Sequence, residues 1–227
     1  MQLEEYSVLL KGEYKEKFDA FRALLLEYNT RYNLTTILEE KDMFYKHFLD
    51  SVAGEKFFPK NAKVIEIGSG AGFPSMPLKL LRDDLSFTLV ESVGKKCEFL
   101  HAVVDKLGLS NVNIYSKRAE DLARENIHRE QYDIATARAV ARMNTLSEYC
   151  LPFVRVGGAF VAYKSGDTTE IEEAKSAYKT LGAKIKALVK YELPEGYGER
   201  TLAVVEKIQP TPNKYPRGQG KERKNPL

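Results

Sequence analysis

Apolar residues recur at intervals of three and four in the first sixty positions, which is the spacing of amphipathic helices. Between positions 14 and 32 this set comprises Phe18, Phe21, Leu25 and Tyr28. The pattern predicts one helix with a single buried face. A second helix is predicted over 39–57, and Pro59 would end it.

Beyond position 63, short β-branched runs alternate with helical segments. That alternation is typical of a parallel sheet whose strands are joined by helices. The predicted parallel strands are 63–67, 86–90, 112–116, 132–137 and 159–164. The helices predicted among and after them are 76–82, 95–107, 122–124, 144–154 and 168–181.

Two more β-rich runs, 184–191 and 200–206, are joined by the turn-forming sequence Pro-Glu-Gly-Tyr-Gly. They predict an antiparallel hairpin at the edge of the sheet, which then has seven strands, most of them parallel. The 227 residues, 43% of them hydrophobic, suffice for one globular core. We therefore expect one α/β domain at 59–208, a helical extension at 1–58 packed on it, and a flexible basic tail at 209–227.

The sharpest local signal is a strand that runs into alternate glycines, Gly68, Gly70 and Gly72, and then into a helix. Glycine lets the backbone turn tightly and lets a ligand approach closely. The dinucleotide fingerprint has a different spacing, G-x-G-x-x-G, and holds a pyrophosphate. The G-x-G-x-G spacing, preceded by the acidic Glu66, favours a ligand without phosphates. A purely structural turn is the alternative.

Glu91 ends the second predicted strand, about 20 residues after the glycine turn. An acidic side chain there conventionally accepts hydrogen bonds from both ribose hydroxyls. Ala119 and Glu120 follow the third strand, where a backbone N–H and a carboxylate could bind the adenine ring. Glu66 would be nearest to a ligand's ammonium, although it could equally cap the turn. Adenosine joined to an amino acid is what S-adenosylmethionine presents.

Several runs of sequence resemble one family of methyltransferases. They are Tyr-Asn-Leu-Thr at 32–35, His-Phe-Leu-Asp-Ser at 47–51, Gly-Ser-Gly-Ala-Gly-Phe-Pro at 68–74 and Thr-Ala-Arg-Ala at 136–139. Together they resemble the bacterial small-subunit rRNA guanine-N7 methyltransferase family, also called glucose-inhibited division protein B. The likeness extends nearly end to end and includes 211–217. The family often has Asp at the positions of Glu66 and Glu91, which are longer acceptors with the same chemistry.

The resemblance implies a class I S-adenosylmethionine-dependent methyltransferase with a Rossmann-like sheet. It implies methyl transfer to guanosine 527 of 16S ribosomal RNA, either as naked rRNA or within the small ribosomal subunit. It also implies a set of cofactor contacts, at Gly68, Phe73, Glu91, Ser92, Val93, Ala119, Glu120 and Arg138.

Guanine N7 offers a lone pair without losing a proton, so we expect no general base. The loop after the fourth strand also lacks the Asn/Asp-Pro-Pro-aromatic sequence of exocyclic amino methylation. Catalysis would then depend on positioning the two reactants and excluding water. Arg138 and Lys164, after the fourth and fifth strands, are the candidates for positioning the substrate. A structural ion pair is the alternative role for Arg138.

The net charge of +3 does not by itself indicate a nucleic-acid binder. Basic residues concentrate in the tail, however, where they could neutralise RNA phosphates as the tail orders. A solvated tail is the alternative, and a histidine on a helix face such as His47 more often packs than binds. The candidate RNA-binding residues are His47, Arg142, Lys214, Arg217, Lys221, Arg223 and Lys224.

Cys97 and Cys150 show no Cys-x-x-Cys or Cys/His pattern, so neither a disulfide nor a metal site is expected. The acidic start and the lack of a long apolar stretch predict a cytoplasmic protein without a membrane segment, and we expect a monomer. A dinucleotide-dependent oxidoreductase is disfavoured by the glycine spacing and the terminal hairpin. A non-catalytic rRNA-binding assembly factor and a methyltransferase for another acceptor remain open.

Overall fold

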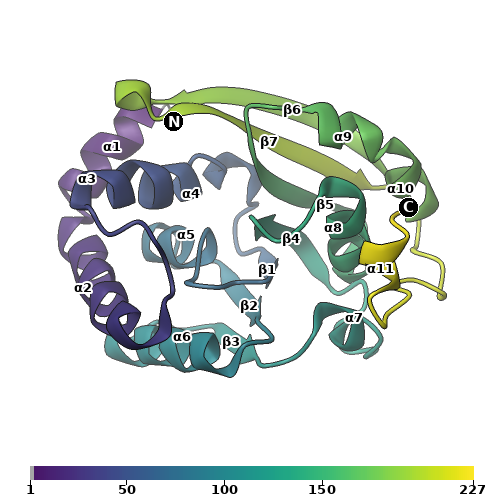
Figure 1. Cartoon of the computed structure of the whole chain (residues 1–227), viewed down its shortest axis with the longest axis horizontal. Helices are drawn as coiled ribbons and strands as arrows, with labels where there is room; N and C mark the ends of the chain where they lie inside the picture. The colour runs from purple at the N-terminus through teal and green to yellow at the C-terminus, as the bar shows by residue number, and fades with distance from the viewer. Residues whose placement is uncertain (1–2) are drawn as a thin grey trace.

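The computed structural model describes residues 3–227, so the first two residues of the expected extension lie outside it. A seven-stranded sheet forms the middle layer (Figure 1). Its strands are β1 (Lys63–Ile67), β2 (Ser86–Val90), β3 (Val112–Tyr115), β4 (Tyr132–Arg138), β5 (Val154–Ser165), β6 (Ala183–Leu193) and β7 (Gly198–Lys207). They are arranged in the order β3-β2-β1-β4-β5-β7-β6.

Strands β1 to β5 run parallel, whereas β7 is antiparallel to both of its neighbours, β5 and β6. The strand order reverses at β1, which lies between β2 and β4. In open α/β sheets, ligands bind at this reversal, outside the carboxyl ends of the strands. The topology therefore places the expected site at the ends of β1, β2 and β4.

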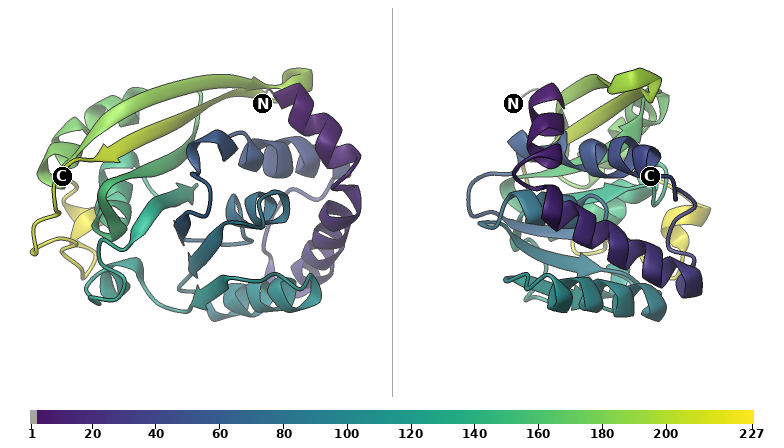
Figure 2. Two further views of the ribbon diagram at one scale, coloured as in Figure 1. Left: turned by 180° about the vertical axis from the view of Figure 1, so that it is seen from behind. Right: turned by 90° about the vertical axis from the view of Figure 1, so that its left-hand side faces the viewer.

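Helices cover both faces of the sheet (Figures 1 and 2). Along β1, Val64 packs into one apolar core, and Ile65 and Ile67 pack into a second core on the opposite face. The helices of the first core are α1 (Leu3–Lys11), α2 (Lys15–Tyr32), α3 (Glu40–Met43), α4 (Asp50–Val52), α5 (Ser75–Leu81) and α6 (Gly94–Lys106). Those of the second are α7 (Ala119–Leu122), α8 (Met143–Cys150), α9 (Thr169–Glu173) and α10 (Lys175–Thr180).

The segment 39–57 is not the single helix that its sequence predicts. A π-helical turn at Phe44–Leu49 separates α3 from α4, and a 3-10 turn follows at Glu55–Phe57. Turns of the π type hold an extra residue and occur frequently at functional sites. His47 lies inside this turn and Asp50 directly after it, and both side chains contact Arg138.

Other helices also differ from their sequence-based predictions. Helix α7 spans Ala119–Leu122 rather than 122–124, and α8 ends at Cys150 rather than at 154. The apolar spacing does not predict α1, in which only Tyr6 and Leu10 are buried. The predicted helix over 168–181 is divided into α9 and α10, because Ala174 has ψ 7° rather than a helical value. Among the described residues, no helix is both long and apolar enough to cross a membrane.

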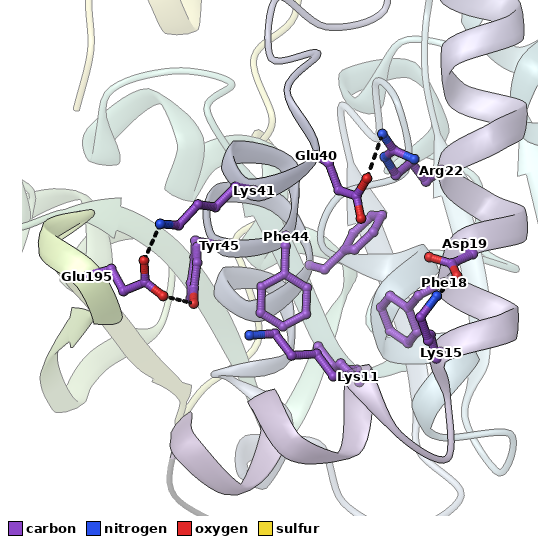
Figure 3. A pocket seen from close by; sticks show the side chains of 12 residues that line it. Lys11, Lys15, Phe18, Asp19, Arg22, Glu40, Lys41, Phe44, Tyr45 and Glu195 are labelled. Atoms are coloured by element: carbon purple, nitrogen blue, oxygen red, sulfur yellow. Dashed lines mark hydrogen bonds and ion pairs between the residues drawn. The ribbon is translucent and has the colours of Figure 1, made fainter.

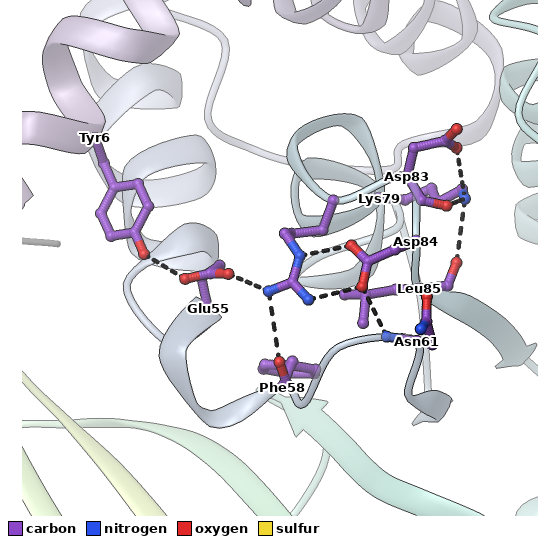
Figure 4. Close-up of polar contacts among 9 residues, drawn as sticks. Tyr6, Glu55, Phe58, Asn61, Lys79, Asp83, Asp84 and Leu85 are labelled. Carbon is purple, nitrogen blue, oxygen red and sulfur yellow. Dashed lines mark hydrogen bonds and ion pairs between the residues drawn. The ribbon is translucent and has the colours of Figure 1, made fainter.

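The N-terminal helices share a core with the sheet domain. The fully buried Phe21 of α2 lies with its ring centroid 5.5 Å from that of Phe73 in the glycine turn and 6.4 Å from that of Phe99 in α6. A polar network adds a second connection (Figure 4). In it Tyr6 donates to Glu55 at 2.8 Å, Arg82 binds the same carboxylate, and Arg82 also forms two hydrogen bonds with Asp84.

The basic C-terminal tail, 209–227, is folded against the domain, which differs from the flexible tail that its composition predicts. Thr211 and Tyr215 are buried, and the short helix α11 (Lys221–Lys224) lies beside α8 (Figure 1). Arg129 holds this path by donating to the carbonyl oxygens of Thr211 and Tyr215 at 2.8 and 2.9 Å. Composition alone could not indicate these acceptors, because they are backbone atoms.

We expect Phe21→Ala to lower the free energy of unfolding by about 3–5 kcal/mol, because it removes a fully buried ring between α2 and the sheet domain. Val8→Ala is the matched control in the same extension: Val8 is 72% exposed, so its loss should change stability by less than about 0.5 kcal/mol. Urea unfolding would measure both values. Equal small effects would mean that the extension is not part of the core.

Candidate functional site

The glycine turn after β1 requires glycine for two different reasons. Gly68, Gly70 and Gly72 all have positive φ values, of 68°, 55° and 84°. A Cβ on Gly68 would lie 2.7 Å from Val140, and one on Gly72 would lie 2.5 Å from Met76. A Cβ on Gly70 would approach only the carbonyl oxygen of Gly68, at 3.8 Å. The turn is therefore tightly packed at its two ends and open at its centre.

The carboxylate of Glu91 points at the open centre of this turn. It is 6% exposed; Oε2 accepts a hydrogen bond from the Gly70 N–H at 3.0 Å, and Oε1 accepts one from the Val93 N–H at 2.8 Å. A carboxylate has about four lone-pair positions, so two remain for the hydroxyls of a ligand. The two backbone hydrogen bonds thus fix the Glu91 side chain and leave acceptor positions for a ligand.

A pocket of about 80 Å³ opens beside Glu91, between the ends of β1, β2 and β3. Five residues that the sequence singles out line it, namely Gly68, Glu91, Ser92, Ala119 and Glu120. Glu120 is buried, and its carboxylate comes from the first turn of α7. Val140, Tyr149 and Arg223 also line it, although the sequence analysis did not assign them to this pocket.

Glu66 lies fully buried beneath the glycine turn. Its Oε2 accepts a weak hydrogen bond from the Ser75 N–H at 3.3 Å, whereas its Oε1 has no partner among the described residues. Burial raises the pKa of this carboxyl to about 8, despite an opposing contribution from Arg138. An unpaired buried carboxyl costs stability. A cationic group bound at the turn would satisfy it.

Arg138, at the end of β4, is held by three groups of the N-terminal segment. Its guanidinium donates to Asp50 at 2.8 Å, to the carbonyl of Lys46 at 2.9 Å and to His47 Nδ1 at 3.1 Å. It also lies over the Phe73 ring, 5.1 Å from the centroid. Within residues 3–227 these bonds use three of its five N–H groups, which leaves two for a ligand.

His47 is a neutral packing partner in this arrangement. Burial and the adjacent charge of Arg138 lower the pKa of His47 to about 4. Nδ1 lies 3.1 Å from the Arg138 guanidinium and 3.2 Å from the Lys46 carbonyl, and Nε2 lies 3.0 Å from Thr35 Oγ1. The ring also stacks on Phe73 with 4.4 Å between centroids. His47 thus orients Arg138, and it is not placed as an exposed RNA-binding cation.

A second pocket, of about 280 Å³, lies on the other side of Arg138. Its lining includes the predicted Lys164, and also Asp50, Tyr163 and Arg200, to which the sequence analysis gave no role. Asp50 is 4% exposed and also accepts from Tyr191 at 2.7 Å. The sequence signal for Asp50 was its place in the His-Phe-Leu-Asp-Ser run. Arg200 offered no signal.

Three consecutive residues, beginning with the last residue of β4, connect the two pockets. Arg138 and Ala139 line the 280 Å³ pocket, and Val140 lines the pocket beside Glu91. Ala139 has φ 57°, a left-handed conformation that is unfavourable for alanine, and strained residues of this kind cluster at functional sites. Lys164 fixes the loop by donating to the Ala141 carbonyl at 2.9 Å and pairing with Glu170 at 3.1 Å.

The remaining predicted residues are distributed around these pockets. Phe73 is buried under Arg138, and Val93 is 46% exposed next to Ser92. Arg142 is exposed and paired with Glu173, and Lys214 lies over the Tyr215 ring. Arg217 is bound to Glu148, whereas two tail lysines remain exposed, at Lys221 and Lys224.

A wider cavity, of about 560 Å³, lies elsewhere, between α1, α2 and the π-helical turn (Figure 3). Its floor is aromatic, including Phe18 and Phe44. Its acidic rim residues are paired: Asp19 with Lys15, Glu40 with Arg22, and Glu195 with Lys41. None of the predicted site residues lines this cavity. We therefore do not assign the cofactor or the methyl acceptor to it, although it is larger than the other two pockets.

Comparison with known proteins identifies the family. The family model for rRNA small subunit methyltransferase G matches residues 14–198. A ribosomal RNA small subunit methyltransferase G from Brevibacillus brevis is 46% identical over 99% of this chain and 96% of the relative. One from Staphylococcus aureus is 43% identical over all of this chain and 95% of the relative. The chain belongs to the rRNA small subunit methyltransferase G family.

Solved structures of two distant proteins show the same fold. An O-methyltransferase from Bacillus cereus in complex with SAH has a TM-score of 0.58 at 17% identity, over 82% of this chain and 91% of that one. The TYW2 protein of M. jannaschii in complex with AdoMet has a TM-score of 0.56 at 14% identity, over 76% and 80%. The expected class I methyltransferase fold is confirmed, and S-adenosylmethionine is the cofactor of this rRNA small subunit methyltransferase G family member.

The unpaired Oε1 of Glu66 leads to a prediction about pH. The ordinary glutamate pKa is 4.5 and the folded value is about 8, so between these values the folded state keeps a proton that the unfolded chain loses. Stability from this group therefore falls as pH rises from about 4.5 to about 8. We expect Glu66→Gln to raise the free energy of unfolding by about 1–3 kcal/mol over the wild type at pH 7.5. The increase should become smaller towards pH 5.

The same variant should bind S-adenosylhomocysteine more weakly, because glutamine offers no charge to the ammonium. Urea unfolding at pH 5 and 7.5 and calorimetric titration with S-adenosylhomocysteine would measure both effects. Glu206→Gln is a control that should not be stabilised at pH 7.5, because Glu206 is a partly exposed carboxylate on β7 whose pKa is lowered by Lys186. A pH-independent loss of stability in Glu66→Gln would contradict a protonated Glu66.

Proposed function

We propose that this chain transfers the methyl group of S-adenosylmethionine to N7 of a guanine in small-subunit ribosomal RNA, at guanosine 527 of 16S rRNA. The observation that carries the proposal is the pair of pockets joined by Arg138, Ala139 and Val140. One pocket contains the acceptors expected for an adenosine, and the other offers cations and space for a base. Relatives named ribosomal RNA small subunit methyltransferase G support RNA as the acceptor.

Residues on the cofactor side have distinct roles in the proposal. When bound, S-adenosylmethionine supplies an electrophilic methyl group on a sulfonium. Glu91 would accept from the ribose hydroxyls and Glu120 from the adenine amino group, while Glu66 would face the ammonium of the methionine part. Gly70 leaves room for the ligand, because no side chain occupies the centre of the turn. Phe73, Ser92, Val93 and Ala119 complete this proposed binding surface.

On the acceptor side, the side chains position the substrate and do not remove a proton. Guanine N7 has a lone pair and no hydrogen, so a methyltransferase for this atom needs no general base. His47 suits such a site, because its pKa of about 4 keeps it neutral, and because its Nδ1 is occupied by Arg138. Asp50 is likewise bound by Arg138 and Tyr191. Arg138 and Lys164 would instead hold the base or its phosphate.

Cationic side chains around the acceptor pocket supply the attraction for RNA. Arg200 is a quarter exposed at the rim, and Arg142 is two-thirds exposed on the next loop. Lys214, Lys221 and Lys224 extend the positive charge along the tail. Phosphate contacts of this kind release counterions, so the affinity for RNA should fall steeply as salt rises.

The acceptor can be tested directly with the purified chain. Small ribosomal subunits and naked 16S rRNA from a bacterium that lacks this methyltransferase would be incubated with S-adenosylmethionine, and modified nucleotides mapped by mass spectrometry. We expect 7-methylguanosine at guanosine 527 and at no other position. Methylation of a different base would contradict the proposed acceptor. Binding of S-adenosylhomocysteine and of rRNA without any transfer would instead favour an assembly factor.

Positioning by Arg138 leads to a further prediction. Arg138→Lys keeps a charge beside Asp50 but cannot reach Asp50, the Lys46 carbonyl and His47 together. We expect kcat to fall by about 100-fold, with the Kd for S-adenosylhomocysteine changed less than threefold. Arg155→Lys is the matched control and should retain full activity. Arg155 is paired with Asp133 near the amino ends of β5 and β4, at the other end of these strands from Arg138. Unchanged kcat in Arg138→Lys would assign Arg138 to structure alone.

A further inference from the structure

The C-terminal tail is attached to helix α8 by a buried ion pair. Arg217 donates its backbone N–H to Glu148 at 2.8 Å, and its guanidinium binds both oxygens of the same carboxylate at 3.0 and 2.7 Å. Glu148 is fully buried, so its charge needs this partner. The arginine that its sequence context assigns to RNA is thus used to fix the tail.

A second attachment fixes α11 close to the end of the chain. Glu222 is fully buried; its carboxylate accepts from the Gly218 N–H, and its carbonyl accepts from Thr145 Oγ1 at 2.9 Å. Both Thr145 and Glu148 belong to α8, so the tail crosses this helix at two points. The register of α11 on α8 is therefore set on either side of Gly218.

This register brings Arg223 to the pocket beside Glu91. Arg223 lines the pocket together with Tyr149 of α8 and with the buried carboxylates Glu91 and Glu120. Burial raises the pKa of Tyr149, and a hydrogen bond with Arg223 opposes that shift. Lys117 and Arg118 line the same pocket from the loop after β3. Arg223 is separated from Lys117 and Arg118 by about half the chain, so the tail and the loop after β3 both contribute to the lining of this pocket.

The pocket beside Glu91 is small for an adenosine. Pockets for small molecules typically measure about 300–1,000 Å³, whereas about 80 Å³ is present here. Glu91 and the glycine turn are fixed by backbone hydrogen bonds. Arg223 is exposed on a four-residue helix and has a long side chain, so its guanidinium has room to move outwards.

We propose that Arg223 is a cofactor-binding residue, and that the tail forms the outer wall of the adenosine part of the pocket. The proposal rests on the cofactor site described above. The guanidinium moves outwards as the adenosine enters and then packs on the exposed face of the purine, since arginine stacks readily on flat π systems. The tail thereby slows the release of S-adenosylmethionine and S-adenosylhomocysteine.

Binding of S-adenosylhomocysteine to the full chain tests this proposal. Titration calorimetry and stopped-flow displacement would give Kd and the dissociation rate for the wild type, Arg223→Ala and Lys224→Ala. We expect Arg223→Ala to raise both quantities about tenfold. Lys224→Ala, the neighbouring exposed cation of α11, should stay within twofold. A wild-type Kd and dissociation rate in Arg223→Ala would overturn the proposal.

A companion variant separates this outcome from failure of the cofactor site itself. Glu91→Ala should abolish measurable binding whatever the tail does. If Glu91→Ala loses binding and Arg223→Ala does not, the cofactor site is supported and the proposed role of the tail is contradicted. If the wild type binds no S-adenosylhomocysteine, the cofactor assignment fails first. Protection of the wild-type tail from trypsin by S-adenosylhomocysteine is the expected independent sign of closure, and unchanged cleavage would contradict it.

Discussion

The hydrogen bond from the Gly70 N–H to the Glu91 carboxylate is the contact on which the site depends. It joins the turn after β1 to the end of β2, next to the strand at which the order reverses. Positive φ at three glycines presents the N–H, and burial keeps the carboxylate in place. The ribose assignment follows from this junction, because it orients the Glu91 carboxylate at the open centre of the turn.

On the side of the methyl acceptor, the N-terminal helical segment supplies the groups that accept hydrogen bonds from Arg138. Asp50, the Lys46 carbonyl and His47 all come from the π-helical turn or from the residue after it. The same helices pack Phe21 against Phe73, which lies under Arg138. The N-terminal extension is therefore part of the site, because the position of the Arg138 guanidinium depends on how these helices pack.

The sheet could be predicted closely from sequence because its signals are local. Short β-branched runs and flanking turns gave β1 and β2 to the residue, and the terminal hairpin in the right place. Gly68, Glu91 and Glu120 could be predicted to lie together because each follows a strand end, and they line one pocket. Asp50 and Arg200 were missed because they meet across 150 residues of chain. The path of the tail was missed because its partner, Glu148, is buried on α8 with no local trace in the tail sequence.

The most direct test of the account is a crystal structure of the chain with S-adenosylhomocysteine. The account predicts the adenosine between the glycine turn and α7, with both ribose hydroxyls within hydrogen-bond distance of Glu91 and the sulfur facing Arg138. Density for the ligand in the 560 Å³ cavity between α1 and α2, or a ribose without contact to Glu91, would contradict it.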